Sequence, residues 1–453
     1  MNNPHENEAQ SVVYGLLRNP STDQLLTVRS NINDEWRLPA ILVNGQEELI
    51  AGIVTRGMSE LLGRPVIACR YVSIQPSNHG DGKEAFFELE GVEEAQSVTL
   101  DADEQWQSAE EIIFEQPHHN GIIHDYIIEA RSGDVPEFRQ PWEHVGWYAK
   151  AASWIGSSLR TLGFQLTAPP EQIKWWCLSC VLRLTTTHGI LYFKTNAKQP
   201  LFAQEPVFLP YIAGIFPDRV PMVLASEPAE GWAILADAGD KLSRDTAENK
   251  IELLRTFGEM QLEMVSRTAE LLELGCADRR PEKLLPYVEP LIEDELVVSE
   301  LTAEEVGVLR KQMPLIVDMY KRMSDYAVPA TLVHGDLHMG NAVIRNGTIT
   351  LIDWTDASVA HPLMDMFLIF DERDITLRAQ LRDAYLELWT DYEPMHRLLE
   401  LWTLCEVVHA IYHSISYQSI LRHTEERSRG ELGPPTFYLR KVLNYLGEPD
   451  MNS

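Results

Sequence analysis

The sequence predicts an α+β protein in three parts: a mixed α/β unit, a strand-rich segment and a long helical region. Strand-like and helix-like patterns alternate over residues 11–130, strand patterns recur between 173 and 239, and helical periodicity dominates from 245 onward. A chain of 453 residues is long enough for about three structural units. The expected boundaries are 1–130 for the first unit, 131–142 for a linker, 143–240 for the strand-rich segment and 241–453 for the helical region.

The first unit is expected to begin with two strands and a helix. Its expected elements, in order, are strands over 11–17 and 23–28, a helix over 47–63, strands over 66–74 and 84–92, and a short helix over 106–115. The segment 132–142 contains two prolines and no periodic pattern, so it is the expected linker.

The rest of the chain changes from strands to helices. A helix over 145–163 precedes strands over 173–195, a short helix over 201–215 and two strands within 220–239. The long helices expected after them are 247–275, 301–326, 377–392 and 395–421.

The composition indicates an ordinary globular chain and limits its partners. The net charge of −30 repels phosphate backbones and anionic lipid, so we expect neither nucleic-acid nor membrane partners. Acids lining a cleft would favour a cationic substrate, although solubility is the more ordinary reason for this charge. No apolar run is long enough to cross a membrane, and from the polar, acidic stretch 1–10 we expect no signal peptide. Five cysteines are too few and odd in number for a disulfide framework, and we expect a reduced, cytoplasmic location.

The candidate catalytic and metal-binding residues lie close together in the segment "LVHGDLHMGNAVIRNGTITLIDW", residues 332–354. The dipeptide Asn346-Gly347 is a strong hairpin signal, and it pairs the strands on either side of it. Counting back from this turn places Asn341 opposite Ile352, next to Asp353. An amide and a carboxylate therefore meet at the open end of the hairpin, and such oxygen ligands suit Mg²⁺.

The loop before the hairpin adds an acid at a mechanistically meaningful spacing. Asp336 precedes Asn341 by five positions, as in the catalytic loop of protein kinases, where the Asp accepts the substrate hydroxyl proton and the Asn holds metal. Together with Asp353 and the preceding His334, these residues occur in the same order as in that kinase arrangement. The alternative is that Asp336 and His338 only cap a turn, and four such residues in order make that alternative weak.

Phosphoryl transfer with ATP also needs a cation on the phosphates and a surface for the adenine. Lys194 ends an apolar strand and Glu205 follows it, so this pair is the candidate phosphate clamp. The hinge candidates are Leu235, Ala236 and Asp237, because "GWAILADAG" ends the strand region just before the helices.

These motifs resemble the aminoglycoside phosphotransferase and choline kinase-like superfamily over about residues 143–453. The resemblance rests on "HGDLHMGN", "LIDW" and "HPLMDM", with upstream similarity around "YFKTN" and "GWAILADAG". It implies a bilobed, protein-kinase-like fold, with a small β-rich lobe and a larger helical lobe. It also implies ATP- and Mg²⁺-dependent phosphorylation of a small-molecule hydroxyl.

The resemblance assigns a role to each matching residue. Asp336 would be the catalytic base, and Asn341 and Asp353 the magnesium ligands, with Lys194 and Glu205 on the ATP phosphates. His334, His338 and Asp365 would support the loop. No glycine occurs in "WWCLSCVLRL", where a loop covering the phosphates is expected, so Ser179 is the substitute candidate there.

The first unit has a fainter resemblance to Nudix domains. "WRLPAILVNGQEELIAGIVTRGMSELLG" follows the Nudix box at Glu48, Arg56, Met58, Glu60 and Gly63. Two acids of that box are replaced, by Gly57 and Leu61. Pyrophosphate hydrolysis needs a cluster of carboxylates to hold its metal, so we expect a Nudix-like fold without hydrolase activity.

Three questions stay open at this point. The chain could instead be a nucleotide-binding pseudokinase or scaffold, or it could retain Nudix hydrolase activity. The acceptor could contact side chains of "CEVVHAIYHSISYQ", although core packing explains that stripe equally well; the candidates are Glu406, His409, Tyr412, His413 and Tyr417. The identity of the acceptor and the oligomeric state are not readable from the sequence.

Overall fold

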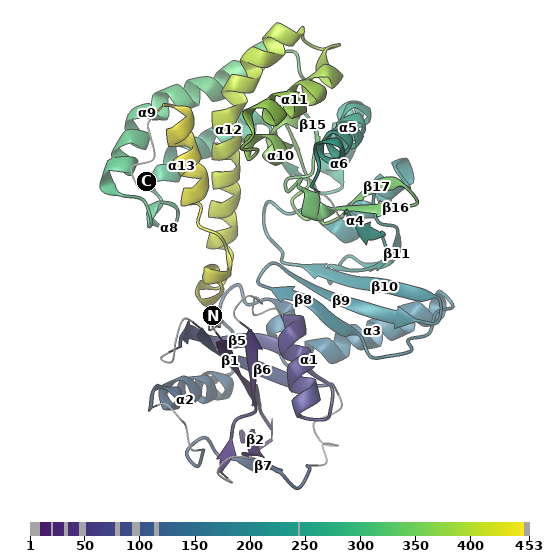
Figure 1. The fold of residues 1–453 in the computed structure, drawn as a ribbon, viewed down its shortest axis with the longest axis vertical. Coiled ribbons are helices and arrows are strands. Elements are labelled where there is room, and N and C mark those ends of the chain that lie inside the picture. Colours follow the sequence, from purple (N-terminus) through teal and green to yellow (C-terminus); the bar gives the residue numbers. More distant parts are fainter. Residues whose placement is uncertain are drawn as a thin grey trace, which may run out of the picture. The chain divides into compact units, whose positions relative to one another are not determined.

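The structure is a computed structural model that describes residues 10–19, 21–30, 35–44, 51–77, 82–92, 100–112, 117–242 and 245–447 (Figure 1). It contains both α-helices and β-strands, as expected. Its contacts group into two compact units, Met1–Lys194 and Thr195–Ser453. We describe each unit by itself.

The first unit is built on a four-stranded sheet in the order β4-β1-β6-β5. Strand β1 pairs antiparallel with β4 and parallel with β6, and β5 pairs antiparallel with β6. A smaller sheet has the order β3-β2-β7. The strands are β1 (Gln10–Leu17), β2 (Leu25–Arg29), β3 (Trp36–Arg37), β4 (Ala40–Asn44), β5 (Val66–Pro76), β6 (Lys83–Gly91) and β7 (Glu104–Gln107).

Two helices cover opposite faces of the four-stranded sheet (Figure 1). Met58 of α1 (Ala51–Leu61) packs beside Leu89, whereas Tyr126 of α2 (Pro117–Ser132) donates a hydrogen bond to Glu88 at 2.9 Å. Leu89 and Glu88 are consecutive residues of β6, and consecutive strand residues point to opposite faces. The even-numbered residues of β6 therefore face α2.

The first unit continues through a third helix and an antiparallel run of strands. These elements are α3 (Trp147–Thr161), β8 (Glu171–Trp176), β9 (Ser179–Thr186) and β10 (Gly189–Asn196), whose last two residues belong to the second unit. Gln172 of β8 connects this run to the N-terminal sheet. Its side chain accepts from Thr55 of α1 at 2.8 Å and bonds both backbone groups of Ala68 in β5, at 2.9 and 3.1 Å.

Two expectations for the first unit are corrected by the structure. The expected helix over 106–115 is wrong, because Glu104–Gln107 form β7 and pair with β2, and residues 108–111 turn. Residues 113–116 lie outside the described part, and so do 47–50 of the expected helix 47–63, including Glu48. Helix α2 was not expected at all.

The second unit is mainly helical, with short strands. Its helices are α4 (Glu205–Ile215), α5 (Ala247–Met264), α6 (Thr268–Glu273), α7 (Pro281–Val288), α8 (Glu295–Val298), α9 (Ala303–Arg322), α10 (Phe367–Phe370), α11 (Ile375–Leu386), α12 (Met395–Arg422) and α13 (Thr436–Tyr445). Its strands are β11 (Val223–Glu227), β12 (Trp232–Ala236), β13 (Asp240–Lys241), β14 (Ala277–Asp278), β15 (Thr331–Val333), β16 (Ala342–Arg345), β17 (Thr348–Leu351) and β18 (Ser358–Ala360).

The long helices occur close to where the periodicity predicts them. Helix α9 begins at a capping box, in which Thr302 accepts from the Glu305 backbone and Glu305 accepts from the Thr302 backbone. The expected helix 247–275 is interrupted by a 3-10 turn over Val265–Arg267, which separates α5 from α6. None of the helices within the described residues is long and apolar enough to cross a membrane.

Two small sheets lie around the motif-bearing loop. One has the order β13-β16-β17, and the other has the order β14-β18-β15. Strand β15 leads into the loop at His334, and β16 and β17 form the hairpin that follows it. One large apolar cluster packs beneath both sheets and includes Trp354, Leu337 and Leu351.

Candidate active site

The predicted hairpin is present with the predicted pairing. Strands β16 and β17 are antiparallel, with Arg345 opposite Thr348. The two residues of the turn have positive φ values of 52° and 79°, as a type I′ turn requires. Ile352 N–H donates to the carbonyl oxygen of Asn341 at 2.9 Å, so pairing extends one step beyond the regular strands. The hairpin therefore holds the backbones of residues 341 and 352 side by side.

Asn341 also joins the hairpin to the loop before it. Its amide Nδ2 donates to the backbone oxygen of Asp336 at 2.9 Å and to the carboxylate Oδ2 of Asp336 at 3.0 Å. Because both hydrogens of the amide are directed toward Asp336, the amide oxygen Oδ1 is the atom that can bind a cation. The structure thus brings the candidate base and the first candidate metal ligand into direct contact.

Asp353, the second candidate metal ligand, has an unusual backbone. Its φ of 64° is in the left-handed region, which costs a non-glycine residue about 1–3 kcal/mol and is concentrated at functional sites. Thr355 donates to its Oδ1 at 3.1 Å. The next residue, Trp354, donates its backbone N–H to Oε1 of Glu205 at 2.8 Å. Glu205 also accepts from the side chain of Asn196, so a buried acid of α4 fixes the chain directly after Asp353.

His334 connects the loop to the second strand of the hairpin. Its Nδ1 accepts from the backbone N–H of Asp336 at 3.3 Å, and its Nε2 lies 3.1 Å from the carbonyl oxygen of Ile352. These two contacts are consistent with one neutral tautomer that carries its proton on Nε2. Burial lowers the pKa of His334, which favours that neutral form. His334 thus positions Asp336 and Asp353 and is not exposed to a substrate.

The buried carboxylate of Asp365 fixes the start of the loop through hydrogen bonds to its backbone. Its two carboxylate oxygens each accept one backbone N–H, from His334 and Gly335, both at 2.7 Å. Burial raises the pKa of Asp365 to about 7. Gly335 has a φ of +87°, and a Cβ there would lie 2.4 Å from the backbone oxygen of Asp356. Only glycine fits this position without displacing the chain that carries Asp353.

Asp336 itself is partly open to solvent and carries a negative charge at neutral pH. Its side chain is 46% exposed, and His338 Nε2 lies 3.4 Å from its Oδ2. Burial alone would raise the pKa of Asp336, but the hydrogen bond and charge of His338 outweigh it and lower that pKa. His338 also caps the short turn Met339–Asn341 by accepting from Gly340 N–H at 2.9 Å. A capping role and a role beside Asp336 therefore coexist in His338.

The hinge candidates lead directly to the hairpin. Leu235 and Ala236 end β12, and Asp237 accepts from the backbone of Gly239 at 3.1 Å. The segment then pairs with β16 as strand β13. Its assignment to adenine binding stays a prediction, but its continuity with the hairpin is a feature that the sequence did not reveal.

Lys194 and Ser179 lie in the first unit. Lys194 is a buried residue of β10, and Ser179 begins β9 and accepts from the indole of Trp176 at 2.7 Å. The pairing of Lys194 with Glu205 and the contact of Ser179 with ATP stay predictions.

The stripe on α12 is mostly core. His409, Tyr412 and His413 are buried, and burial lowers the pKa of both histidines. Glu406 is paired with Arg378 at 2.6 Å. Tyr417 is less buried than these three, and its pKa is raised mainly by burial but also by the negative charges of Asp336 and Asp356. The charge of Asp336 also acts on His413, so the end of the stripe from His413 to Tyr417 lies toward the candidate base.

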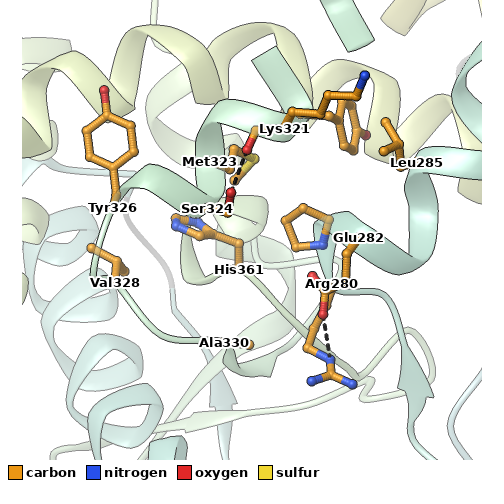
Figure 2. A pocket seen from close by; sticks show the side chains of 12 residues that line it. Arg280, Glu282, Leu285, Lys321, Met323, Ser324, Tyr326, Val328, Ala330 and His361 are labelled. Carbon is orange, nitrogen blue, oxygen red and sulfur yellow. Dashed lines mark hydrogen bonds and ion pairs between the residues drawn. The ribbon is translucent and has the colours of Figure 1, made fainter. Parts of the chain in front are cut away.

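Two cavities in the second unit lie apart from the candidate base. One of them has a volume of about 450 Å³. Figure 2 shows the side chains that line it, among which Ser324 donates to the Lys321 backbone at 2.7 Å and Arg280 pairs with Glu282 at 3.5 Å. His361 also lines this cavity. The other, of about 530 Å³, is lined partly by Glu205. Neither is lined by Asp336, Asn341 or Asp353, so cavity size alone would not have located the candidate site.

The donor atoms that the loop and hairpin bring together fit a hard cation. Asn341 Oδ1 and the Asp353 carboxylate are oxygen donors, and they lie at the two strand ends of one hairpin. Mg²⁺ is typically held by one or two carboxylates together with substrate phosphates. The residues present therefore suit Mg²⁺ bound with a nucleotide.

Comparison with known proteins identifies one domain. Residues 200–399 match the model of the phosphotransferase enzyme family, APH, and this segment is an APH family domain. No curated protein matches the chain.

Several solved structures resemble the chain at low sequence identity. Choline kinase LicA from Streptococcus pneumoniae is 14% identical, with 66% of this chain and 100% of that chain covered and a TM-score of 0.47. The aminoglycoside phosphotransferase APH(2")-IIia, solved with GDP and kanamycin, is 14% identical, with 64% and 98% covered and a TM-score of 0.47. Macrolide 2'-phosphotransferase MphH from Brachybacterium faecium is 14% identical, with 66% and 100% covered and a TM-score of 0.44.

Proposed function

We propose that the chain is an ATP- and Mg²⁺-dependent phosphotransferase that phosphorylates a hydroxyl group of a small molecule. The contact of Asn341 with Asp336, at the open end of a hairpin whose other strand leads to Asp353, carries this proposal. All three residues lie inside the APH family domain. A turn-capping role alone would not require the strained backbone of Asp353 beside them.

In the proposed mechanism Asp336 orients the acceptor hydroxyl and accepts its proton. Its lowered pKa keeps the carboxylate ionised at neutral pH, and its partial exposure gives an acceptor access. Asn341 and Asp353 would hold Mg²⁺, which offsets charge on the phosphates when it is bound. His334 and Asp365 do not touch the acceptor. They position the backbones of the residues that do, through the hydrogen bonds described above, and Glu205 fixes the chain directly after Asp353.

The remaining contacts to ATP belong to the same proposal. Lys194, paired with Glu205, would form the clamp on the phosphates, and Leu235, Ala236 and Asp237 would contact the adenine through their backbone. The continuity of this hinge segment with β13 and the hairpin supports its place at the nucleotide.

For the acceptor we propose a hydroxylated amine. The negative charges of Asp336 and Asp356 reach Tyr417, so a cationic group would be favoured there over an anionic one. Neutral sugars that carry a comparable hydroxyl but no amine test how much the amine contributes.

A pseudokinase or scaffold is the competing function. A protein that only binds a nucleotide would not need an ionised, half-exposed Asp336 held beside a cation-binding amide. We also propose that the first unit has a Nudix-like fold without hydrolase activity, because the acids of its box are replaced at Gly57 and Leu61 in α1.

The test is a screen of the full chain against hydroxylated metabolites and aminocyclitols. Thermal shift would identify ligands, and ATP consumption with mass spectrometry of the product would identify acceptors. We expect turnover that requires both an acceptor and Mg²⁺. ATP binding without phosphorylation of any acceptor, across amines and neutral sugars alike, would support the pseudokinase instead.

A further inference from the structure

A group of metal-ligand side chains lies in the first unit, outside the residues of the Nudix-like pattern. It consists of Glu84, the second residue of β6, and His118 and His119, at the start of α2. One carboxylate oxygen, Oε2 of Glu84, lies 3.2 Å from His118 Nε2 and 3.1 Å from His119 Nε2. Within the described part of the chain, it is the one group of three such residues whose ligand atoms converge.

The spacing of these atoms matches the ligand shell of a small ion. Zinc ligands from His and Glu lie at about 2.0–2.2 Å, so two of them at a tetrahedral angle are separated by about 3.4 Å. The three ligand atoms lie within 4.8 Å of one another. The two distances from Glu84 Oε2, 3.1 and 3.2 Å, are already close to the tetrahedral separation, so an ion could enter once the two imidazoles turn toward it.

The packing around the cluster limits its motion on one side and leaves it open on the other. Glu84 and His119 are buried, whereas the side chain of His118 is 36% exposed. The ring of His119 packs edge-on against Tyr14 at 5.1 Å and Phe86 at 5.0 Å. Two ligands are thus fixed in the sheet and its helix, while the third faces the route by which an ion and a water could enter.

Glu88, another acid on the same face of β6, is a buried carboxylate whose charge is balanced within the protein. Glu88 is paired with Arg70 at 2.7 Å and accepts from Tyr126 at 2.9 Å, so a permanent cation neutralises it. Glu84 has two histidines instead, and the Nε2 atoms of both rings face its Oε2. One carboxylate beside two imidazoles is a donor set that zinc enzymes use.

We propose that Glu84, His118 and His119 bind a divalent transition metal, with Zn²⁺ as the best fit, and leave one coordination position to solvent. Two nitrogens and one oxygen select such an ion over Mg²⁺, which prefers oxygen ligands. The ion would tie the first turn of α2 to the central strand of the sheet. The site is independent of the proposed phosphotransfer site, because it shares no residue with it.

Titration of ZnCl₂ into metal-free, untagged full chain by calorimetry tests the proposal. We expect one Zn²⁺ bound per chain in the presence of excess Mg²⁺, and Co²⁺ in its place should give the visible absorption of a four-coordinate ion. His118→Ala and Glu84→Gln should each weaken Zn²⁺ binding by more than about tenfold. Loss of a residue that only supports a ligand already costs about tenfold, so loss of a ligand should cost more. Because His118 is partly exposed, its replacement should leave the metal-free fold intact, as circular dichroism would verify.

The matched control is His124→Ala, an exposed histidine of the same helix that lies beside Asp125. It should bind Zn²⁺ as the unmodified chain does, and so should Asp353→Asn, which alters only the proposed magnesium site. Absence of stoichiometric Zn²⁺ binding would overturn the proposal. So would unchanged binding in both His118→Ala and Glu84→Gln, which would reduce the cluster to a hydrogen-bonded carboxylate.

Discussion

The loop and hairpin of the second unit and helix α1 of the first unit both carry residues of a motif for metal-dependent chemistry, but only in the loop and hairpin do an acid and the amide of the motif contact one another. Around the loop, Asp336, Asn341 and Asp353 each have partners that fix their position. In α1, the side chain of Ile41 packs closely against Gly57, since a Cβ added there would lie 2.7 Å from its Cδ1. Leu61 is 45% exposed. The comparison shows that polar residues of a sequence motif are better evidence for an active site when hydrogen bonds hold their side chains and backbones next to one another.

A large effect, second only to that of Asp336→Asn described below, is expected at the proposed metal ligand of the hairpin. Asp353→Asn should lower kcat by about 10²–10³-fold, because it removes a charge that positions the cation at the reacting phosphates. Steady-state rates over a Mg²⁺ titration measure this effect, and a higher Mg²⁺ requirement should accompany it. An unchanged rate and an unchanged Mg²⁺ requirement would place the metal elsewhere.

The second prediction compares two glycines with similar backbone angles. Gly335→Ala should lower the free energy of unfolding by about 2–4 kcal/mol, since strain at positive φ adds to a backbone clash with Asp356. Gly347→Ala, at φ +79° with nothing within 4 Å of the added Cβ, should lose only about 1–2 kcal/mol. Urea unfolding of both variants measures the difference, and equal losses would show that the loop does not pack closely on the segment after Asp353.

The third prediction uses the buried carboxyl that holds the loop. Because the pKa of Asp365 is about 7 in the folded chain against 3.8 ordinarily, the folded state keeps a proton that the unfolded state releases between these values. The contribution of Asp365 to stability therefore decreases as the pH rises toward 7. Relative to Asp365→Asn, the unmodified chain should lose up to about 1.4 kcal/mol per pH unit between pH 5 and 6.5.

Urea unfolding of the two proteins at several pH values gives this difference directly. A difference in unfolding free energy that does not depend on pH would show that Asp365 is already ionised throughout this range.

The smallest effect is expected in α1. Leu61→Glu restores one acid at an exposed position, so stability should change by less than about 0.5 kcal/mol. Hydrolysis of nucleoside diphosphate derivatives should stay absent, because Gly57 still lacks a carboxylate. Metal-dependent cleavage that is lost again on Glu60→Gln would contradict the proposal that this unit is not a hydrolase.

The extent to which the fold could be predicted is illustrated by one dipeptide at two positions. Asn346-Gly347 forms the turn that the sequence predicts, because alternating apolar residues flank it. Asn120-Gly121 lies inside α2, where Ile123, Tyr126 and Ile127 pack into the core and override the local turn preference. The turn residues are enough to predict the hairpin, because its two strands are adjacent in the sequence. Helix α2 forms because its apolar residues pack into the core, and the dipeptide alone does not show this.

The same distinction applies to the candidate site. The spacing of Asp336 and Asn341 is local, and the sequence placed them together. Asp365 reaches the loop from 30 residues away, and Glu205 reaches Trp354 from 149 residues away. A single sequence does not show such contacts, although family resemblance marked both acids. Glu84 and the two histidines were missed for the same reason, with a Pro-His-His start of a helix as the only local signal.

The central claim is that Asp336 acts on the acceptor hydroxyl while the hairpin holds the cation. The most direct measurement is single-turnover transfer of the γ-phosphoryl group of ATP to an identified acceptor by the unmodified chain and by Asp336→Asn. The account predicts a rate about 10²–10⁴-fold lower for the variant, with an unchanged melting temperature and retained ATP binding. Equal rates for the two proteins would contradict it.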